Sequence, residues 1–321
     1  MRPISECLKL SFVIPLYNCL PLTQAMLASL RATIPAGLAH EIILVDDGST
    51  DGTREWLATL TDPSCRIVLN EKNLGYAAAN NRGAALARGE FIALLNNDLV
   101  LTPSWLEPML DLHNRLGAQA GLISNVQLNA RTGTLDHTGV FIDHKGKPQH
   151  DRTPPSDFRR RGQDWRMVDL VTGACVLIRR ELWQQLGGFD QRYHNGCEDI
   201  DLCLRAKAAG HANAVAFRSV VRHHISASPG RKLRDEANCY RLTLRWRGEL
   251  AQIGLPAWCR RFLEWDLNAA TKPSVSTSVL AYTLHLRRTP PPAALTGMEA
   301  AIAFEIARWE KMFGPDDVSS K

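Results

Sequence analysis

Two amides and a carboxylate, Asn96, Asn97 and Asp98, follow directly on the apolar run 91–95. A short apolar run of this kind predicts a buried strand, and open α/β sheets bind their ligands at the carboxyl ends of the strands. One carboxylate among amides can hold Mg²⁺ or Mn²⁺ when a phosphate or another side chain completes the oxygen shell. Taken alone, the same residues are equally compatible with a turn in which Asn97 or Asp98 caps a helix that starts at Pro103.

Acidic side chains occur at two further places where a strand is expected to end or a helix to start. Asp46 and Asp47 follow one strand, and Glu198, Asp199 and Asp201 open a helix. The helix dipole favours a carboxylate in the first turn, but a cap needs one acid and here there are three. Glu198 and Asp201 can share a helical face, whereas Asp199 and Asp201 cannot. We therefore expect a division of roles, in which one acid faces a reacting hydroxyl and another holds the helix or binds the acceptor.

The adjacent histidines His223 and His224 follow another expected strand. Neutral imidazole is the commonest protein ligand for borderline metals, but a pair of histidines at the end of a strand is also typical of a core. The residues alone leave both interpretations open.

The elements that would carry these residues alternate between strand and helix. Strands are predicted at 10–16, 41–46, 66–70, 90–95 and 120–126, and helices at 21–31, 53–60, 75–88 and 103–116. Alternation at this spacing indicates βαβ units, a largely parallel sheet and right-handed crossovers.

The later part of the chain is less regular. Residues 129–166 are rich in turn formers and predict a short hairpin with a mobile loop. We expect strands at 168–179 (interrupted at 172–174), 214–217 and 220–223, helices at 181–186 and 198–210, further helices beyond residue 230, and a last helix at 295–312 after a triple proline.

The composition is that of an ordinary globular protein, with 45% hydrophobic and 22% charged residues in a chain of 321. A formal charge of +5 is too small to argue for nucleic acid, and we expect no nucleic-acid partner. Basic residues gather in two segments, either as solvated faces or as partners of an anionic substrate or membrane. They are Arg152, Arg159, Arg160, Arg161 and Arg166, and then Arg231, Lys232, Arg234, Arg241, Arg245 and Arg247.

Cysteine usage and the absence of long apolar stretches favour a soluble or peripheral protein of the cytoplasm. The eight cysteines form no CxxC pair and no zinc spacing, which is typical of buried thiols in a reducing compartment. No stretch approaches eighteen continuous apolar residues, and charges stand where a signal peptide would need its apolar segment.

Five motifs in a fixed order resemble the family 2 glycosyltransferases of the GT-A fold, over about residues 8–230. They are Val13-Ile14-Pro15-Leu16-Tyr17-Asn18; Val45-Asp46-Asp47-Gly48-Ser49-Thr50-Asp51-Gly52-Thr53; Asn73-Leu74-Gly75 with Asn80-Asn81-Arg82-Gly83; Leu95-Asn96-Asn97-Asp98; and Gly188-Phe189-Asp190 with the run from Glu198 to Arg205.

The resemblance implies a fold and a division of the chain. It implies an α/β protein with a Rossmann-like, mostly parallel central sheet flanked by helices, and a catalytic domain over 1–230. The nucleotide-sugar half would span about 8–126, the acceptor half about 127–230, and a helical extension 231–321.

The resemblance also implies a chemistry: an inverting single displacement on a nucleotide-diphospho-sugar, with Mg²⁺ or Mn²⁺ on the diphosphate. Asp199 would be the general base, Asp98 and His223 (followed by Ser226 and Ser228) the metal ligands, and Glu198 and Asp201 acceptor-binding or helix-capping residues. The implied donor-binding residues are Pro15, Tyr17, Asn18, Asp46, Asp47, Asn73, Asn81, Asn97 and Gly173. Asp46 would accept a hydrogen bond from a pyrimidine imide, and residues 172–174 would wall the donor sugar.

Asn96 departs from the family's pattern because it replaces the first acid of an Asp-x-Asp motif. The protein then gives the metal one charge less, so we expect weak affinity for the free ion and help from the bound nucleotide.

The leading hypothesis is a UDP- or dTDP-sugar transferase, with dTDP-rhamnose as one candidate donor, acting on a glycan or lipid-linked acceptor in bacterial surface polysaccharide synthesis. The alternative is a catalytically silent nucleotide-sugar or glycan-binding module of the same fold. A nucleotidyltransferase is disfavoured because Tyr17, Asn18 and Cys19 follow the first strand where a glycine- and basic-rich loop would be expected.

The last third of the chain would serve acceptor recognition or touch the inner face of the plasma membrane. A basic and aromatic face is expected there from Trp258, Arg260, Arg261, Phe262 and Trp265, although packing on the catalytic domain is the commoner fate of tryptophan at helical spacing.

Overall fold

A computed structural model describes residues 9–159, 162–224, 235–266 and 273–314. Several residues considered above therefore lie outside the described part: Arg160, Arg161, Ser226, Ser228, Arg231, Lys232 and Arg234. The chain divides into two units. The first comprises 1–140 and 150–233, and the second comprises 141–149 and 234–321.

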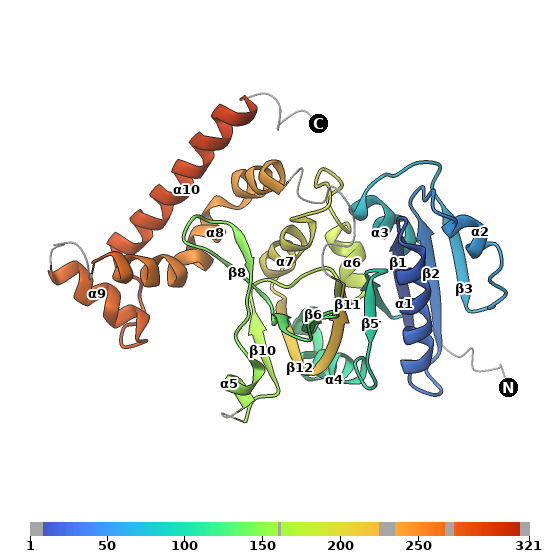
Figure 1. Ribbon diagram of the computed structural model, residues 1–321. Helices are drawn as coiled ribbons and strands as arrows, with labels where there is room; N and C mark the ends of the chain where they lie inside the picture. Colours follow the sequence, from blue (N-terminus) through green and yellow to red (C-terminus); the bar gives the residue numbers. More distant parts are fainter. Residues whose placement is uncertain (1–8, 160–161, 225–234, 267–272, 315–321) are drawn as a thin grey trace. The chain divides into compact units, whose positions relative to one another are not determined.

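The first unit is an α/β structure around one twisted sheet (Figure 1). Its strand order is β10-β12-β6-β11-β4-β1-β2-β3, with β5 paired to β12 and β7 paired to β6. The strands are β1 (Leu10–Leu16), β2 (His40–Asp46), β3 (Cys65–Leu69), β4 (Phe91–Leu95), β5 (Leu99–Leu101), β6 (Ala120–Asn129), β7 (Leu135–His137), β10 (Trp165–Val168), β11 (Cys175–Arg179) and β12 (Ala212–His223).

The half of the sheet from β4 to β3 is parallel throughout, as the alternation of strands and helices predicted. β6 and β12 are also parallel to each other, whereas β11 is antiparallel to both of its neighbours, β4 and β6. The sheet therefore joins a parallel half to a mixed half, and β11 brings the segment before it alongside the end of β4.

Helices cover both faces of this sheet. Phe12 and Ile14 of β1 belong to the core cluster that includes the buried residues of α1 and α4, while Val13 faces α3 on the opposite side. A strand buried on both faces reads as a continuous apolar run, which explains why β1 was recognisable from its sequence. The helices are α1 (Leu20–Thr33), α2 (Thr53–Leu57), α3 (Tyr76–Ala84), α4 (Glu107–Leu116), α5 (Pro155–Arg159), α6 (Arg180–Leu186) and α7 (Glu198–Ala208), with a 3₁₀ turn η1 at Gly117–Gln119.

The second unit consists of helices and most of a hairpin. The hairpin is β8 (Val140–Ile142) with β9 (Pro148–His150), and the helices are α8 (Asp235–Asp266), α9 (Pro273–Thr283) and α10 (Pro292–Phe313). α8 is kinked at Trp246, where the backbone leaves helical geometry. α10 packs closely against α8 at two glycines. A Cβ atom added to Gly297 would lie 2.1 Å from Trp258, and one added to Gly254 would lie 2.4 Å from Met298.

The segment after Asp98 differs from the expectation. The helix does not begin at Pro103 but at Glu107, and a short strand, β5, precedes it. Ser104 has a left-handed backbone (φ 58°), which a continuous helix excludes. Because β5 pairs with β12, residues 99–101 extend the sheet and cannot belong to the helix.

The described residues of 129–166 are also more ordered than expected, because they contain three short strands, the start of a fourth and a helix. In the apolar run 168–179, Val168 ends β10 and only Cys175–Arg179 form a further strand, while residues 212–223 form one strand with a break in register opposite β6. None of the helices in the described part of the chain is long and apolar enough to span a membrane.

Candidate active site

A cavity opens in the first unit where the carboxyl ends of β1 and β4 meet the starts of α3 and α7. The residues that line it are Pro15, Leu16, Tyr17, Asp47, Asn73, Gly75, Tyr76, Ala79, Asn96, Asn97, Asp98, Thr172, Gly173, Ala174, Asn195, Glu198 and Asp199. Nine of the residues proposed from the sequence are thus brought together, namely Pro15, Tyr17, Asp47, Asn73, Asn97, Asp98, Gly173, Glu198 and Asp199.

Asp98 lines this cavity and contacts His223, which is not itself among the lining residues. His223 is the last residue of β12 and is buried, and its Nε2 lies 3.0 Å from Oδ1 of Asp98. Asn96 adds an amide whose Nδ2 lies 3.4 Å from the same imidazole nitrogen. β5 places His223 here, because its antiparallel pairing with β12 sets His223 opposite Leu99. The alternative of a helix cap is wrong, because β5 separates Asn97 and Asp98 from α4.

The donor atoms around Asp98 fit a hard divalent cation. Oδ1 of Asn96 is buried and accepts no hydrogen bond, and Oδ1 of Asp98 is buried with the His223 imidazole as its polar neighbour. Buried oxygens without a donor are costly, and a cation would satisfy them. In the described chain no group of three or more His, Cys, Asp or Glu side chains surrounds one point. Asp98 and His223 would hold Mg²⁺ or Mn²⁺ with the amide oxygen of Asn96 beside them.

Asp199 lies at the start of α7 on another wall of the cavity. Its Oδ2 accepts the N–H of Gly173 at 2.8 Å, and its Oδ1 accepts the N–H of Ile200 at 2.8 Å. Each carboxylate oxygen keeps a lone pair for a further partner. The carboxylate is therefore fixed in orientation and still able to receive a proton from a hydroxyl in the cavity.

The other two acids of α7 take separate positions, although their spacing would allow Glu198 and Asp201 to share a helical face. Glu198 lines the cavity, and its Oε2 accepts the N–H of Gly196 at 2.6 Å, so it also holds the loop before the helix. Asp201 is fully buried and pairs with Arg205, whose Nε lies 2.7 Å from Oδ2. Asp201 does not line the cavity, because its helical position turns it into the protein interior.

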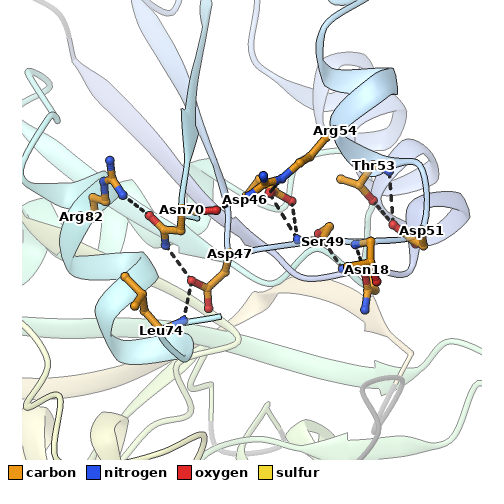
Figure 2. Close-up of polar contacts among 11 residues, drawn as sticks. Asn18, Asp46, Asp47, Ser49, Asp51, Thr53, Arg54, Asn70, Leu74 and Arg82 are labelled. Carbon is orange, nitrogen blue, oxygen red and sulfur yellow. Dashed lines mark hydrogen bonds and ion pairs between the residues drawn. The ribbon is translucent and has the colours of Figure 1, made fainter. Parts of the chain in front are cut away.

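Asp47 organises the wall formed by the loop before α3 (Figure 2). Its Oδ1 accepts the N–H of Leu74 at 2.9 Å and the amide of Asn70 at 2.6 Å, and its Oδ2 accepts the N–H of Gly75 at 2.9 Å. Arg82 binds the other side of Asn70. Asp47 thus lies in the cavity wall and holds the following segment in place, with both of its carboxylate oxygens accepting hydrogen bonds.

Asp46 has a different environment from its neighbour. It is fully buried, its carboxylate pairs with Nε of Arg54 at 2.7 Å, and it accepts the N–H of Ser49. It is absent from the cavity lining, so a hydrogen bond to a nucleobase would require it to exchange these contacts. Asn18 is likewise occupied, since its Oδ1 accepts the N–H of Thr50 at 2.8 Å and its own N–H donates to Ser49 Oγ.

Two of the candidate amides join segments of the fold. Asn81 bonds both backbone groups of Phe189, donating to its carbonyl at 2.8 Å and accepting its N–H at 2.9 Å, and it does not line the cavity. Asn97 lines the cavity, while its amide donates to Oγ1 of Thr23 at 2.9 Å.

Sequence reasoning missed Tyr76 and Asn195, which both line the cavity. The Tyr76 hydroxyl donates to the carbonyl of Gly173 at 2.9 Å, and its backbone N–H donates to Oδ1 of Asn195 at 2.9 Å. Neither lies in an acidic or glycine-rich pattern, so the position of Tyr76 directly after Asn73-Leu74-Gly75 was the one available signal.

Comparison with known families agrees with this geometry. The model of the family described as Glycosyl transferase family 2 matches residues 11–187. An N-acetylglucosaminyl-diphospho-decaprenol L-rhamnosyltransferase of Mycobacterium tuberculosis is 31% identical over 235 residues, which are 67% of this chain and 76% of the relative. The O-antigen biosynthesis protein RfbC of Myxococcus xanthus is 31% identical over 262 residues, which are 79% of this chain and 20% of that protein.

Solved structures share the fold at low sequence identity. A mannosyltransferase from Pyrobaculum calidifontis, in complex with GDP-Man and Mn²⁺, has a TM-score of 0.57 at 18% identity over 96% of this chain and 88% of its own. GalNAc-T7 with UDP, GalNAc and Mn²⁺ has a TM-score of 0.62 at 16% identity over 95% of this chain and 58% of its own. The chain spans only a quarter of a Sinorhizobium fredii relative that is 32% identical to it, and a fifth of the M. xanthus protein.

Proposed function

Because this chain belongs to glycosyl transferase family 2, we propose that it transfers a sugar, with inversion, from a UDP- or dTDP-sugar to a glycan or lipid-linked saccharide acceptor in bacterial surface polysaccharide synthesis. The observation that carries the proposal is that Asp199 and Asp98, which pairs with His223, line the same cavity. The rhamnosyltransferase relative, of which the chain covers 76%, makes dTDP-rhamnose the first donor to test.

Asp199 is assigned the role of general base. Its carboxylate takes the proton of the acceptor hydroxyl while that oxygen forms a bond to the anomeric carbon of the donor. The bond from the anomeric carbon to the diphosphate breaks in the same step, and the leaving diphosphate keeps the electron pair. One displacement at one carbon inverts its configuration.

The part of the cavity at Asp98 serves the leaving group. A divalent cation held by Asp98 and His223 would neutralise charge that develops on the diphosphate. Gly173 and Ala174 leave room beside Asp199 for a sugar ring, and Tyr17, which is 41% exposed, offers a ring face at the mouth of the cavity for the nucleoside. Metal dependence is part of this proposal, and the two neighbouring structures that contain Mn²⁺ support it.

The test is donor turnover by the purified chain with a panel of nucleotide sugars, with and without Mn²⁺. Asp199→Asn should lower kcat at least about a hundredfold, since a general base contributes that much or more, while nucleotide binding persists. Asp98→Ala should raise the Mn²⁺ concentration needed for half-maximal activity. Glu181→Gln, an exposed carboxylate on α6, is the matched control and should behave like the wild type. Full activity in either cavity variant would remove its assigned role.

A catalytically silent module is the second outcome of the same experiment. It would bind the nucleotide sugar, raising the unfolding temperature in proportion to affinity and concentration, but would consume no donor with any acceptor. That result would overturn the transferase assignment while retaining the binding site.

We also propose that the second unit contacts an anionic membrane surface peripherally. The aromatic residues expected in its face are partly packed: Trp258 stacks on Phe262 with ring centroids 5.1 Å apart, and of these three aromatic residues only Trp265 is largely exposed, at 68%. The structure instead exposes Leu284 and Leu286, which follow the uncharged helix α9. Arg287 and Arg288 come directly afterwards and are exposed too. Apolar side chains beside arginines are typical of an interfacial contact.

Vesicle co-sedimentation decides this point. The chain should sediment with vesicles containing phosphatidylglycerol and not with neutral phosphatidylcholine vesicles, and the double variant Leu284→Glu/Leu286→Glu should lose binding. Wild-type protein that stays in the supernatant with anionic vesicles at low salt would refute the contact.

A further inference from the structure

Tyr76, the first residue of α3, holds two segments that come from a distant part of the chain. Its hydroxyl donates to the carbonyl of Gly173 at 2.9 Å, and its backbone N–H donates to the side chain of Asn195 at 2.9 Å. Its ring lies against Phe189, with centroids 5.8 Å apart. Tyr76 thus joins the start of α3 to the wall at Gly173 through its hydroxyl and to the loop that leads into α7 through its backbone N–H.

The residue that Tyr76 holds is the one that orients Asp199. The N–H of Gly173 donates to Oδ2 of Asp199 at 2.8 Å, while the carbonyl of the same residue accepts from Tyr76. A Cβ at Gly173 would lie 3.2 Å from Cβ of Asp199 and 3.4 Å from the Tyr76 hydroxyl. Because glycine has no side chain, Tyr76 and Asp199 can both contact this segment, one from each side.

The loop before α7 needs such support, because its backbone is strained. Asn195 (φ 56°) and Cys197 (φ 69°) both adopt the left-handed conformation that residues other than glycine rarely take. Each residue of this kind costs on the order of 1 kcal/mol and persists only where its surroundings impose it. The Asn195 side chain accepts a hydrogen bond from Tyr76, and the Glu198 side chain accepts one from Gly196. These hydrogen bonds hold both ends of the loop from which the helix that carries Asp199 starts.

Tyr76 is in turn fixed from the other half of the sheet. The two residues before it, Leu74 and Gly75, donate their N–H groups to Asp47 at the end of β2. A continuous series of hydrogen bonds therefore runs from Asp47 through the start of α3 to Gly173 and Asp199. It links the part of the cavity where the nucleotide would lie to the part where the acceptor hydroxyl would lie.

We propose that Tyr76 is a positioning residue for the general base, which acts through Gly173 and Asn195 on the orientation of the Asp199 carboxylate; this rests on the proposed function. A base must be held within about half an ångström of its productive geometry, because misplacement by 1 Å can cost about a hundredfold in rate. Tyr76 contributes through orientation, and it neither binds the metal nor accepts the proton.

The test removes one oxygen, with Tyr76→Phe. The expected result is a fall in kcat of about tenfold with the donor KM changed less than twofold, because nucleotide binding does not depend on the orientation of Asp199. In an Asp199→Asn background, Tyr76→Phe should have no further effect on the residual rate, since the carboxylate it orients is gone. Tyr282→Phe, on α9 in the second unit, is the matched control for loss of a tyrosine hydroxyl.

Two results would overturn the proposal: an unchanged kcat in Tyr76→Phe, or an equal loss in the presence and absence of the Asp199 carboxylate. Hydrogen exchange of the Gly173 amide separates this failure from failure of the proposed function. Tyr76→Phe should speed that exchange about tenfold whether or not the wild type turns over a donor. Unchanged exchange would show that the hydroxyl does not hold the segment.

Discussion

Asn96 is the residue at which this cavity differs from a metal site with two carboxylates. Its Oδ1 is buried and without a hydrogen-bond donor, close to the Asp98–His223 pair. Asn96→Asp would place a second negative charge at this point. Since charge count sets the affinity of oxygen sites for divalent cations, the Mn²⁺ concentration for half-maximal activity should fall about tenfold.

The control for that change is Asn97→Asp. Asn97 donates its amide to Thr23, so a carboxylate at this position should not lower the Mn²⁺ concentration needed for half-maximal activity. The measurement is a titration of Mn²⁺ at saturating donor. A metal requirement that stays the same or rises in Asn96→Asp would mean that this side chain does not face the cation.

His113 makes a separate prediction about pH. It is 1% exposed on α4, lies edge-on to Phe91 with ring centroids 4.7 Å apart, and neither ring nitrogen has a hydrogen-bond partner. Burial, assisted by the nearby Arg179 charge, lowers its pKa from 6.5 to about 4. Between about pH 6.5 and pH 4 the unfolded chain therefore binds a proton at this histidine that the folded chain does not bind. The free energy of unfolding falls as the pH drops from about 6.5, and the loss levels off below about pH 4.

His113→Leu should remove this dependence. Relative to the wild type, the variant should gain about 2 kcal/mol of unfolding free energy between pH 7.5 and pH 5. Urea unfolding at both pH values measures the gain, and taking the difference between the two proteins cancels the contribution of other groups. A difference between the proteins that is independent of pH would contradict the assignment.

Among single residues, the sequence indicated which kinds of side chain form the site, but not which way each side chain points. Asp46 and Asp47 are adjacent at the end of a strand, where successive side chains point to opposite sides, and only Asp47 reaches the cavity. Nothing in the sequence says which one does. The role of Tyr76 could not be inferred from the sequence, because it depends on a contact with Gly173, which lies almost a hundred residues later.

At the scale of elements, long apolar runs were predicted well and short strands were not. β1 matched its expected bounds because both of its faces are buried. β5, β7 and β9 have three residues each, too few to show a period, so β5 was not predicted and only a hairpin without strand bounds was expected where β7 and β9 lie. β5 matters most, because its pairing with β12 brings His223 to Asp98.

The packing of α3 on the sheet depends on Gly83. A Cβ at this position would lie 2.5 Å from Val13 and 2.9 Å from Val45, which are fixed in β1 and β2. Gly83→Ala should therefore destabilise the protein by about 1–3 kcal/mol through overpacking, although alanine is the better helix former.

Gly248→Ala is the matched control, since Gly248 lies in α8 with nothing within 4 Å of its Cβ position. It should raise stability by about 0.5–1 kcal/mol. Denaturant unfolding of both variants tests the pair. Equal effects would mean that α3 is not held as closely to the sheet as its glycine indicates. Because α3 carries Tyr76, Gly83→Ala should also lower kcat.

At the scale of the whole molecule, the chain is two units whose boundary does not follow the sequence. The hairpin residues 141–149 belong with the helices after residue 234. In that unit Lys147 of the hairpin donates to Glu236 of α8 at 3.0 Å and lies 3.4 Å from Glu305 of α10. Arg308 and Trp309 of α10 also bind Glu236. Such a charge network between three distant segments leaves no local pattern in the sequence.

Glu236 is therefore expected to hold the second unit together. Hydrogen bonds from Trp309, Arg308 and Lys147 outweigh burial and lower its pKa from 4.5 to about 2. Its contribution to stability should be complete above about pH 4.5 and should be lost as the pH falls towards 2. Because the side chain is 43% exposed, solvent screens part of the effect, and we expect Glu236→Gln to cost about 1–2 kcal/mol at pH 7.

Calorimetry distinguishes this effect from damage to the active site. Glu236→Gln should lower the unfolding temperature at pH 7, whereas Glu299→Gln, an exposed acid on α10, should not. The affinity for nucleotide should be the same in both variants, since the cavity lies in the first unit and Glu236 in the second. An unfolding temperature that is unchanged in Glu236→Gln would mean that the hairpin and the helices are held by their apolar contacts, such as Gly146 on Ile302, without help from the charges.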